Sequence, residues 1–170
     1  MKKIGFGGEG SMAEAGIGWI VELGASQPQN IFVMNKSDKD RLTSLKNKYG
    51  VSIVCTEREA LEIADLVVLA TKPNDIHQAM ADICPHLNKN AAILSVIAGV
   101  SISTIENGLG KRPIARSMPN TSATIGKSAT GIAMNNAVDD NMRIQLLELF
   151  EAIGLVKEVE EDDLHAVTAL

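Results

Sequence analysis

Cysteine and histidine are scarce in this sequence, and their scarcity excludes two kinds of site. Only Cys55 and Cys84 occur among the 170 residues, and they lack the number and spacing that a disulfide framework or a metal site requires. The three histidines, His77, His86 and His165, lie far apart and are interpreted as surface residues. We therefore expect no bound metal, and a reducing compartment, the cytoplasm, as the location of the protein.

Excess positive charge and long apolar runs are missing too. The chain has 16 Lys and Arg residues against 21 Asp and Glu residues, so no basic stripe favours a nucleic-acid or membrane partner. No apolar run reaches about 18 residues, the length of a membrane span. Residues 1–3 lead into neither a long apolar run nor a cleavage site, so no signal peptide is expected. We expect a soluble domain, 45% hydrophobic, whose local groups can still bind a small anionic ligand.

What the sequence does contain begins with a glycine-rich turn at residues 5–13. It follows a short apolar strand and precedes an Ala-rich helix over residues 12–23. Within it, Gly8-x-Gly10-x-x-Ala13 matches the dinucleotide fingerprint, whose small residues allow the tight turn, the approach of a pyrophosphate and helix–strand packing. The free N–H groups at the helix start also favour phosphate. Glycines in such turns have a purely steric explanation as well, and the motif alone leaves that alternative open.

Strand-like and helix-like segments alternate along the rest of the chain. Continuous apolar runs of strand length are typical of parallel strands that are buried on both faces. The sequence predicts further strands at residues 31–34, 51–54, 66–70, 91–97, 113–116, 128–134 and 155–159, and helices at residues 39–49, 57–64, 76–87 with a break at Pro85, 101–107 and 139–153. This alternation predicts an α/β fold, a doubly wound parallel sheet of the Rossmann type. We assign residues 1–159 to one dinucleotide-binding domain.

Four loops follow predicted strands at the same edge of this sheet. They comprise residues 8–12, 35–37, 70–73 and 98–99. In doubly wound sheets, ligands bind at the carboxyl ends of the strands, near the point where the strand order reverses. We therefore expect the four loops to converge on one crevice, and this agreement between topology and fingerprint strengthens the prediction of a dinucleotide site.

The loop after the second strand indicates which dinucleotide binds. Units that bind NAD usually place a carboxylate here, which bonds the ribose 2′-hydroxyl. This chain has Asn35, Lys36 and Ser37, a cation between two neutral hydrogen-bonding side chains, and this set suits a 2′-phosphate. The loop therefore predicts NADP, with NAD as the alternative cofactor. Ser37 and Asp40 also fit a helix capping box, and both interpretations can hold at once.

These loops belong to a longer pattern that resembles pyrroline-5-carboxylate reductase, the last enzyme of proline biosynthesis. The matching pieces follow one another through the whole chain at residues 4–15, 35–37, 64–73, 95–100, 116–121 and 166–170. The Met-Pro-Asn-Thr stretch at residues 118–121 and the Ala-Val-Thr-Ala-Leu stretch at residues 166–170 are the most specific. The resemblance implies NADP-dependent reduction of 1-pyrroline-5-carboxylate to L-proline, with the cofactor carrying the reactivity. No catalytic side chain is assigned.

The resemblance also implies which residues contact the cofactor. With Asn35 and Lys36 added from the loop described above, the candidates are Gly7, Gly8, Glu9, Gly10, Ser11, Met12, Asn35, Lys36, Ser37, Glu57, Ala70, Thr71, Lys72, Pro73, Ala98, Gly99 and Asn120. Lys72, Pro73 and Asn120 would lie toward the nicotinamide end. Without the family, Lys72 is a solvated lysine at a strand end, Pro73 a helix initiator and Asn120 part of an Asx turn.

Four residues depart from the family pattern. Glu9 stands between the phosphate-binding glycines where the family has a small residue, and Gly7 replaces an aliphatic residue. Glu57 replaces an asparagine that contacts the adenosine side, and Ser122 replaces a proline. Because Glu9 and Glu57 add two carboxylates near an anionic ligand, we expect weakened cofactor binding rather than its loss.

Members of the family continue past the last residue of this chain into a Ser-Gly-Ser-Gly-Pro turn and a helical second domain. That domain is expected to form a homo-oligomer and to complete the substrate pocket. We expect a fragment, with natural truncation as the alternative, in which residues 160–170 begin a connecting helix that has nothing to pack on. Such a chain would bind NADPH with little or no turnover. Two other interpretations stay open: a non-catalytic NADP-binding regulatory module, and another NADP-dependent imine or hydroxyacid reductase.

Overall fold

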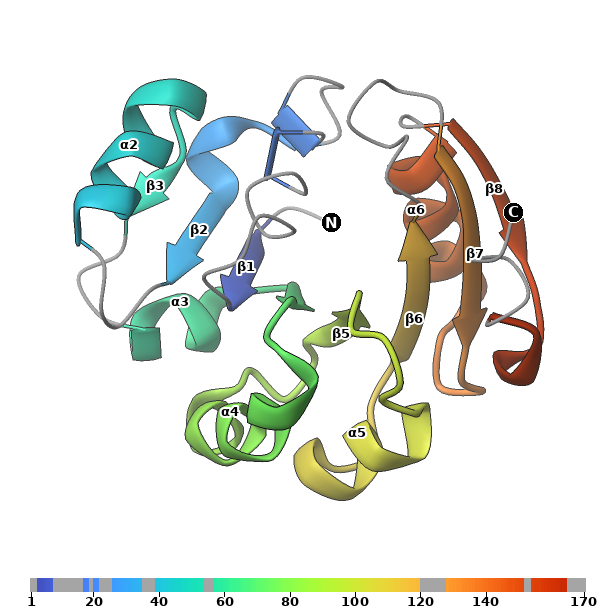
Figure 1. Ribbon diagram of the computed structural model, residues 1–170. Helices are drawn as coiled ribbons and strands as arrows, with labels where there is room; N and C mark the ends of the chain where they lie inside the picture. The colour runs from blue at the N-terminus through green and yellow to red at the C-terminus, as the bar shows by residue number, and fades with distance from the viewer. Residues whose placement is uncertain are drawn as a thin grey trace.

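The computed structural model describes residues 3–7, 17–18, 20–21, 26–34, 39–53, 57–119, 128–151 and 154–164. These residues form an eight-stranded sheet with helices on both faces (Figure 1). The strands are β1 (Ile4–Gly7), β2 (Ile31–Met34), β3 (Ser52–Ile53), β4 (Leu66–Leu69), β5 (Ala92–Ser95), β6 (Ile114–Pro119), β7 (Ser128–Met134) and β8 (Gly154–Glu158). The helices are α2 (Lys39–Tyr49), α3 (Glu57–Ile63), α4 (Ile76–Ile83), α5 (Ile102–Leu109) and α6 (Asp140–Glu151), with short 3₁₀ turns η1 (Pro28–Asn30), η2 (Pro73–Asp75), η3 (Cys84–His86) and η5 (Glu161–Asp163).

The strand order is β3-β2-β1-β4-β5-β6-β7-β8, and the first six strands run parallel. This confirms the predicted α/β, Rossmann-type fold. The two last strands differ from the prediction of a wholly parallel sheet, because β7 is antiparallel to β6 and β8 runs parallel to β7. The reason is chain length: a parallel crossover needs a dozen or more residues, whereas residues 120–127 are too few for one.

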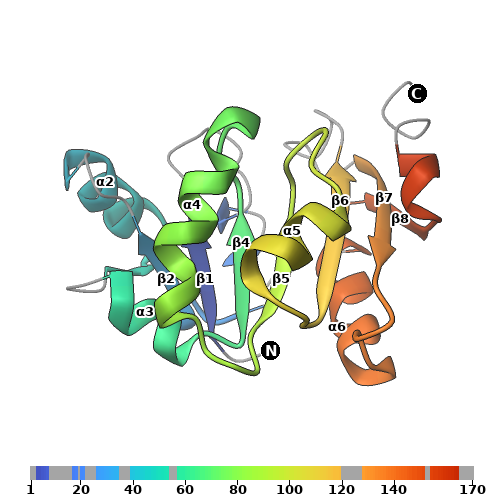
Figure 2. The same cartoon turned by 90° about the horizontal axis from the view of Figure 1, so that it is seen from below.

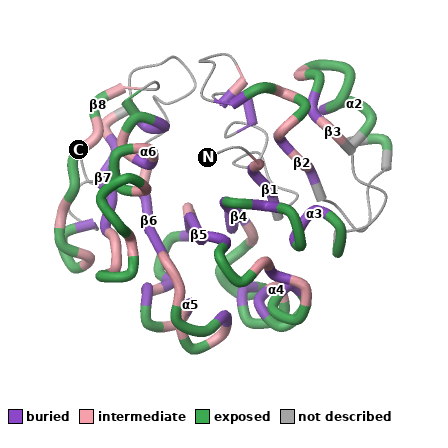
Figure 3. Tube along the Cα trace, turned by 180° about the vertical axis from the view of Figure 1, so that it is seen from behind, coloured by how far each residue is buried: buried purple, intermediate pink, exposed green. Residues whose placement is uncertain are grey.

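Two hydrophobic cores hold the helices against the sheet. One face packs against α2, α6 and residues 17 and 20, and its core includes Phe6, Val68 and Phe150. The other face packs against α3, α4 and α5, and Figure 2 shows α4 and α5 lying across the strands on this side. All four residues of β4 are buried, and alternate ones enter opposite cores. This double burial is the reason for its continuous apolar run, and Figure 3 shows the buried positions on the central strands.

Three predicted boundaries are corrected by local packing. The helix α4 ends at Ile83 and Pro85 lies in the 3₁₀ turn that follows, because proline has no N–H to continue the helix. The helix α5 continues through Gly108, where a Cβ atom would lie 2.6 Å from the Met80 sulfur of α4, so glycine here allows close helix packing. The strand β6 extends to Pro119 because it pairs with β7 along that length.

The described part of the segment after β8, which ends at Leu164, packs against the domain and corrects the expectation that it has nothing to pack on; residues 165–170 lie outside the described residues. Leu164 is fully buried, and the Glu161 side chain forms hydrogen bonds to α5 and β6. Among the described residues, no helix has both the length and the apolar character that would let it cross a membrane.

Candidate functional site

The carboxyl ends of four neighbouring parallel strands form one row at one edge of the sheet. In the register, Gly7 of β1 lies between Met34 of β2 and Leu69 of β4, and Leu69 lies beside Ser95 of β5. The strand order reverses between β1 and β4, because the chain moves outward from β1 to β3 and then returns to β4. This reversal is the position where doubly wound sheets bind ligands. The segments that follow β4 and β5 therefore leave the sheet at one place.

The loop after β4 contains a buried hydroxyl group that has no hydrogen-bond partner in the described part of the chain. Ala70 is buried, and the neighbouring Thr71 Oγ1 atom is also buried but has no hydrogen-bond partner among the described residues. A buried hydroxyl without a partner is unfavourable, so this position suits a ligand group that accepts or donates a hydrogen bond. Lys72 is exposed, and Pro73 is the first residue of the 3₁₀ turn η2, which agrees with the helix-initiator interpretation of this proline.

The loop after β5 presents small residues beside that hydroxyl-bearing loop. Its base is held by the Val96 N–H, which donates to the Leu69 carbonyl at 3.1 Å, and by the Ile97 N–H, which donates to Ser95 Oγ at 3.3 Å. Ala98 and Gly99 are exposed. Gly99 has a φ of 76°, a conformation that favours glycine, and a Cβ atom built there would meet no atom within 4 Å. The loop thus leaves open space in front of its backbone.

The remaining candidates are described only in part. Gly7 is the last residue of β1, and the backbone of Glu57 begins α3. The predictions made for the glycine-rich turn, for the loop after β2 and for the Met-Pro-Asn-Thr stretch lie outside the described residues at Gly8, Glu9, Gly10, Ser11, Met12, Asn35, Lys36, Ser37 and Asn120. The structure therefore brings together the loops at residues 70–73 and 98–99 and leaves the other contacts as predictions.

Sequence reasoning missed an ion pair close to this edge, in which the arginine is buried and the glutamate half-buried. Arg116 lies on β6, its side chain is 4% exposed, and its Nη1 atom donates to Glu161 Oε1 at 2.6 Å. The same carboxylate oxygen accepts a 2.7 Å bond from the Ile102 N–H at the start of α5. Arg116 Nε and Nη2 have no partner among the described residues. An arginine within a buried strand was the available signal, because a buried charge requires a partner.

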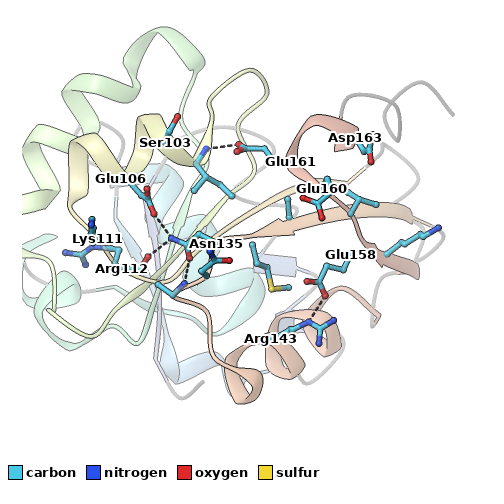
Figure 4. A pocket seen from close by; sticks show the side chains of 17 residues that line it. Ser103, Glu106, Lys111, Arg112, Asn135, Arg143, Glu158, Glu160, Glu161 and Asp163 are labelled. Atoms are coloured by element: carbon cyan, nitrogen blue, oxygen red, sulfur yellow. Dashed lines mark hydrogen bonds and ion pairs between the residues drawn. The ribbon is translucent and has the colours of Figure 1, made fainter.

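A separate hollow of about 1160 Å³ lies among α5, the ends of β7 and β8, and the segment around Glu160 (Figure 4). Asn135 organises one wall, since its Nδ2 donates to Glu106 Oε1 at 2.8 Å and to the Arg112 carbonyl at 2.9 Å. Burial lowers the pKa of the Arg112 guanidinium from its usual value. Acidic and basic side chains both line the hollow, so no single charge favours one ligand class. None of the described candidate residues lines it.

Comparison with known proteins identifies relatives of the whole chain. Pyrroline-5-carboxylate reductase 2 of Bacillus subtilis (strain 168) is 42% identical over 171 aligned positions, which cover 100% of this chain and 61% of that protein. The structure of a pyrroline-5-carboxylate reductase from Coxiella burnetii has a TM-score of 0.90 and 34% identity, covering 99% of this chain and 63% of that one. These matches confirm the resemblance that the motifs predicted.

A further solved structure shows the same fold at lower identity. The Plasmodium falciparum pyrroline carboxylate reductase with NADP bound has a TM-score of 0.82 and 23% identity, and it covers 95% of this chain and 59% of that one. The chain thus spans about three-fifths of the length of the proteins that it matches.

A family model gives the classification. The model described as "NADP oxidoreductase coenzyme F420-dependent" matches residues 3–99, which is more than half of the 170 residues. The match begins before β1 and ends at Gly99, so it contains the row of strand ends and both described loops. The chain therefore belongs to the NADP oxidoreductase coenzyme F420-dependent family.

Proposed function

We propose that this chain is the coenzyme-binding part of an NADP-dependent pyrroline-5-carboxylate reductase, which reduces 1-pyrroline-5-carboxylate to L-proline in the cytoplasm. The observation that carries the proposal is similarity over the full chain to proteins of that name, at 42% identity to one of them. The site supports it independently, because the described loops meet at the strand-order reversal. A similarly folded reductase has been solved with NADP bound.

The described residues fit a bound dinucleotide. Among the described residues, the buried Thr71 hydroxyl has no hydrogen-bond partner and no atom fills the space in front of Gly99. We assign the nicotinamide half to the loops at residues 70–73 and 98–99, since the loop after β2 takes the adenosine ribose in folds of this type. Residues 8–12 would then hold the phosphates, and Lys36 with Ser37 the 2′-phosphate.

The chemistry divides between the coenzyme and the chain. When bound, NADPH supplies the hydride that reduces the imine carbon. The chain binds and orients the coenzyme, and the small residues Ala70, Ala98 and Gly99 let a flat ring approach the strand ends. A protonated imine is already electrophilic, so the proposal requires no acidic or nucleophilic side chain from this chain. The substrate pocket is assigned to the part of the relatives that this chain does not cover.

The relatives' additional length bears on the domain organisation. We propose that residues 160–170 begin the connection to a second domain, which dimerises the whole protein and holds the small-molecule substrate. A non-catalytic regulatory module is the second candidate, because the resemblance implies that the carboxylates of Glu9 and Glu57 would lie near the anionic coenzyme and weaken its binding. A coding sequence that continues past Leu170 into a Ser-Gly-Ser-Gly-Pro turn would favour the reductase, and a stop codon there the module.

The proposed coenzyme preference gives the first test. Isothermal titration calorimetry of the chain with NADPH and with NADH should give a dissociation constant about tenfold lower for NADPH. The reason is that the 2′-phosphate can form charge-assisted hydrogen bonds with Lys36 and Ser37. Changing Lys36→Gln should reduce that difference, and Lys39→Gln, in the following helix α2, serves as the charge-matched control. Equal or tighter NADH binding by the native chain would reject the NADP preference.

A further inference from the structure

The Arg116–Glu161 pair joins three segments that are distant in the sequence. Arg116 belongs to β6, Glu161 begins the 3₁₀ turn η5 after β8, and Ile102 is the first residue of α5. One carboxylate oxygen, Glu161 Oε1, accepts hydrogen bonds from both of the other residues, at 2.6 Å and 2.7 Å. Figure 4 shows the Glu161 carboxylate directed toward α5. The carboxylate therefore ties the start of α5 and the middle of β6 to the segment that follows β8.

Because the Arg116 guanidinium is buried, it depends on the Glu161 carboxylate as its counter-charge. The Arg116 side chain is 4% exposed, and among the described residues its hydrogen bonding consists of the bond to Glu161. A buried guanidinium without a counter-charge is strongly unfavourable, so the carboxylate must stay in place. Glu161 also supplements the N-cap of α5, where Ser101 Oγ already accepts the Thr104 N–H at 3.1 Å. The orientation of the first turn of α5 is consequently set by a residue from the far end of the chain.

Two of the three segments lead to the proposed nicotinamide half of the crevice. Gly99, which follows Ala98, is separated by a single residue from Ser101, the N-cap of α5, and β6 leads through Met118 and Pro119 toward Asn120 in the sequence. The adenosine half is assigned to the β1–β2 side of the strand-order reversal, away from β6. A displacement of the pair would therefore move the loops near the nicotinamide and leave those near the adenosine unchanged.

We propose that Arg116 and Glu161 are positioning residues that hold the loop at Ala98 and Gly99, together with the end of β6, against the nicotinamide half of the coenzyme. This inference rests on the proposed function. In this proposed arrangement, neither the Arg116 nor the Glu161 side chain touches the coenzyme. Both act through the backbone of α5 and β6.

The test compares a whole coenzyme with its adenosine half. Glu161→Gln keeps an oxygen acceptor and removes the charge that pairs with Arg116, so it should weaken NADPH binding about fivefold. Adenosine 2′,5′-bisphosphate lacks the nicotinamide. Its dissociation constant should stay within about 1.5-fold of the native value, because the Arg116–Glu161 bond lies away from the adenosine half of the site. The enhancement of NADPH fluorescence, which reports on the nicotinamide environment, should fall in parallel. Glu160→Gln is the matched control, because it removes the exposed carboxylate of the neighbouring residue. It should change the dissociation constant of neither NADPH nor adenosine 2′,5′-bisphosphate.

Each outcome decides the proposal. The positioning role would be overturned if Glu161→Gln weakened the binding of both ligands equally, or left NADPH binding unchanged. In either case the native chain would still bind NADPH, and the proposed function would stand. A native chain that binds neither ligand would overturn both. If Glu161→Gln fails to fold, the double change Arg116→Met with Glu161→Leu removes both charges without leaving one buried and unpaired. It should show the same selective loss of NADPH, and equal loss of both ligands would again overturn the inference.

Discussion

Changing Glu161→Ala is expected to lower the free energy of unfolding by about 3 kcal/mol, since removal of one partner leaves a buried charge uncompensated. The buried charge is Arg116, whose side chain is 4% exposed and whose hydrogen bonding, among the described residues, consists of the bond to Glu161. The substitution also removes the acceptor of the Ile102 N–H at the start of α5. Urea unfolding followed by circular dichroism measures the change.

The double variant Arg116→Met with Glu161→Ala separates the two contributions. Replacing the buried guanidinium by an apolar side chain removes the unpaired charge, so most of the lost stability should return. The single and double variants should therefore differ by about 2 kcal/mol in favour of the double variant. A double variant as unstable as Glu161→Ala alone would show that the loss does not come from the unpaired arginine.

Changing Phe6→Ala should cost about 4 kcal/mol of stability, the typical result of deleting a fully buried aromatic ring. Phe6 lies on the central strand β1, is 1% exposed, and belongs to the core beneath α2 and α6. The strand β1 is also the one that precedes the glycine-rich turn in the sequence. Urea unfolding of the variant gives the loss.

Phe32, an aromatic residue packed on the opposite face of the sheet, provides the matched control for the Phe6 variant. It lies on the adjacent strand β2, its backbone pairs with Gly5, and it is partly buried against the core on the opposite face. Phe32→Ala should therefore cost about half as much as Phe6→Ala, because less surface is withdrawn from water. Equal losses for the two variants would contradict the difference in burial between Phe6 and Phe32.

Local patterns predicted most of the sheet, for identifiable reasons. The continuous apolar run at residues 66–69 indicated a strand buried on both faces, and both cores indeed receive side chains from β4. The alternation of such runs with helices predicted the Rossmann-type order, and the order predicted that the loops after β4 and β5 converge. The reversed direction of β7 was overlooked although the length of residues 120–127 already excluded a parallel crossover.

Long-range partners could not be predicted in the same way. Glu161 and Arg116 are 45 positions apart, and nothing in the local pattern of acidic residues 160–163 distinguishes the half-buried, paired carboxylate of Glu161 from its exposed neighbours. The hollow beside α5 likewise depends on how β7 and β8 turn past that helix, which is a tertiary property. The resemblance to the reductases could be found from the sequence because each motif is a run of neighbouring residues. These contacts join residues that are distant in the sequence, so no local pattern predicts them.

The measurement that tests the central claim most directly is an NMR titration of the isotope-labelled chain with NADPH, with the amide signals assigned. The proposal predicts that the amides of Thr71, Lys72, Ala98 and Gly99 shift in proportion to saturation, while those of Ser103 and Asn135 in the separate hollow stay unchanged. Shifts confined to the hollow, or none at saturating NADPH, would contradict a coenzyme site at the carboxyl ends of β4 and β5.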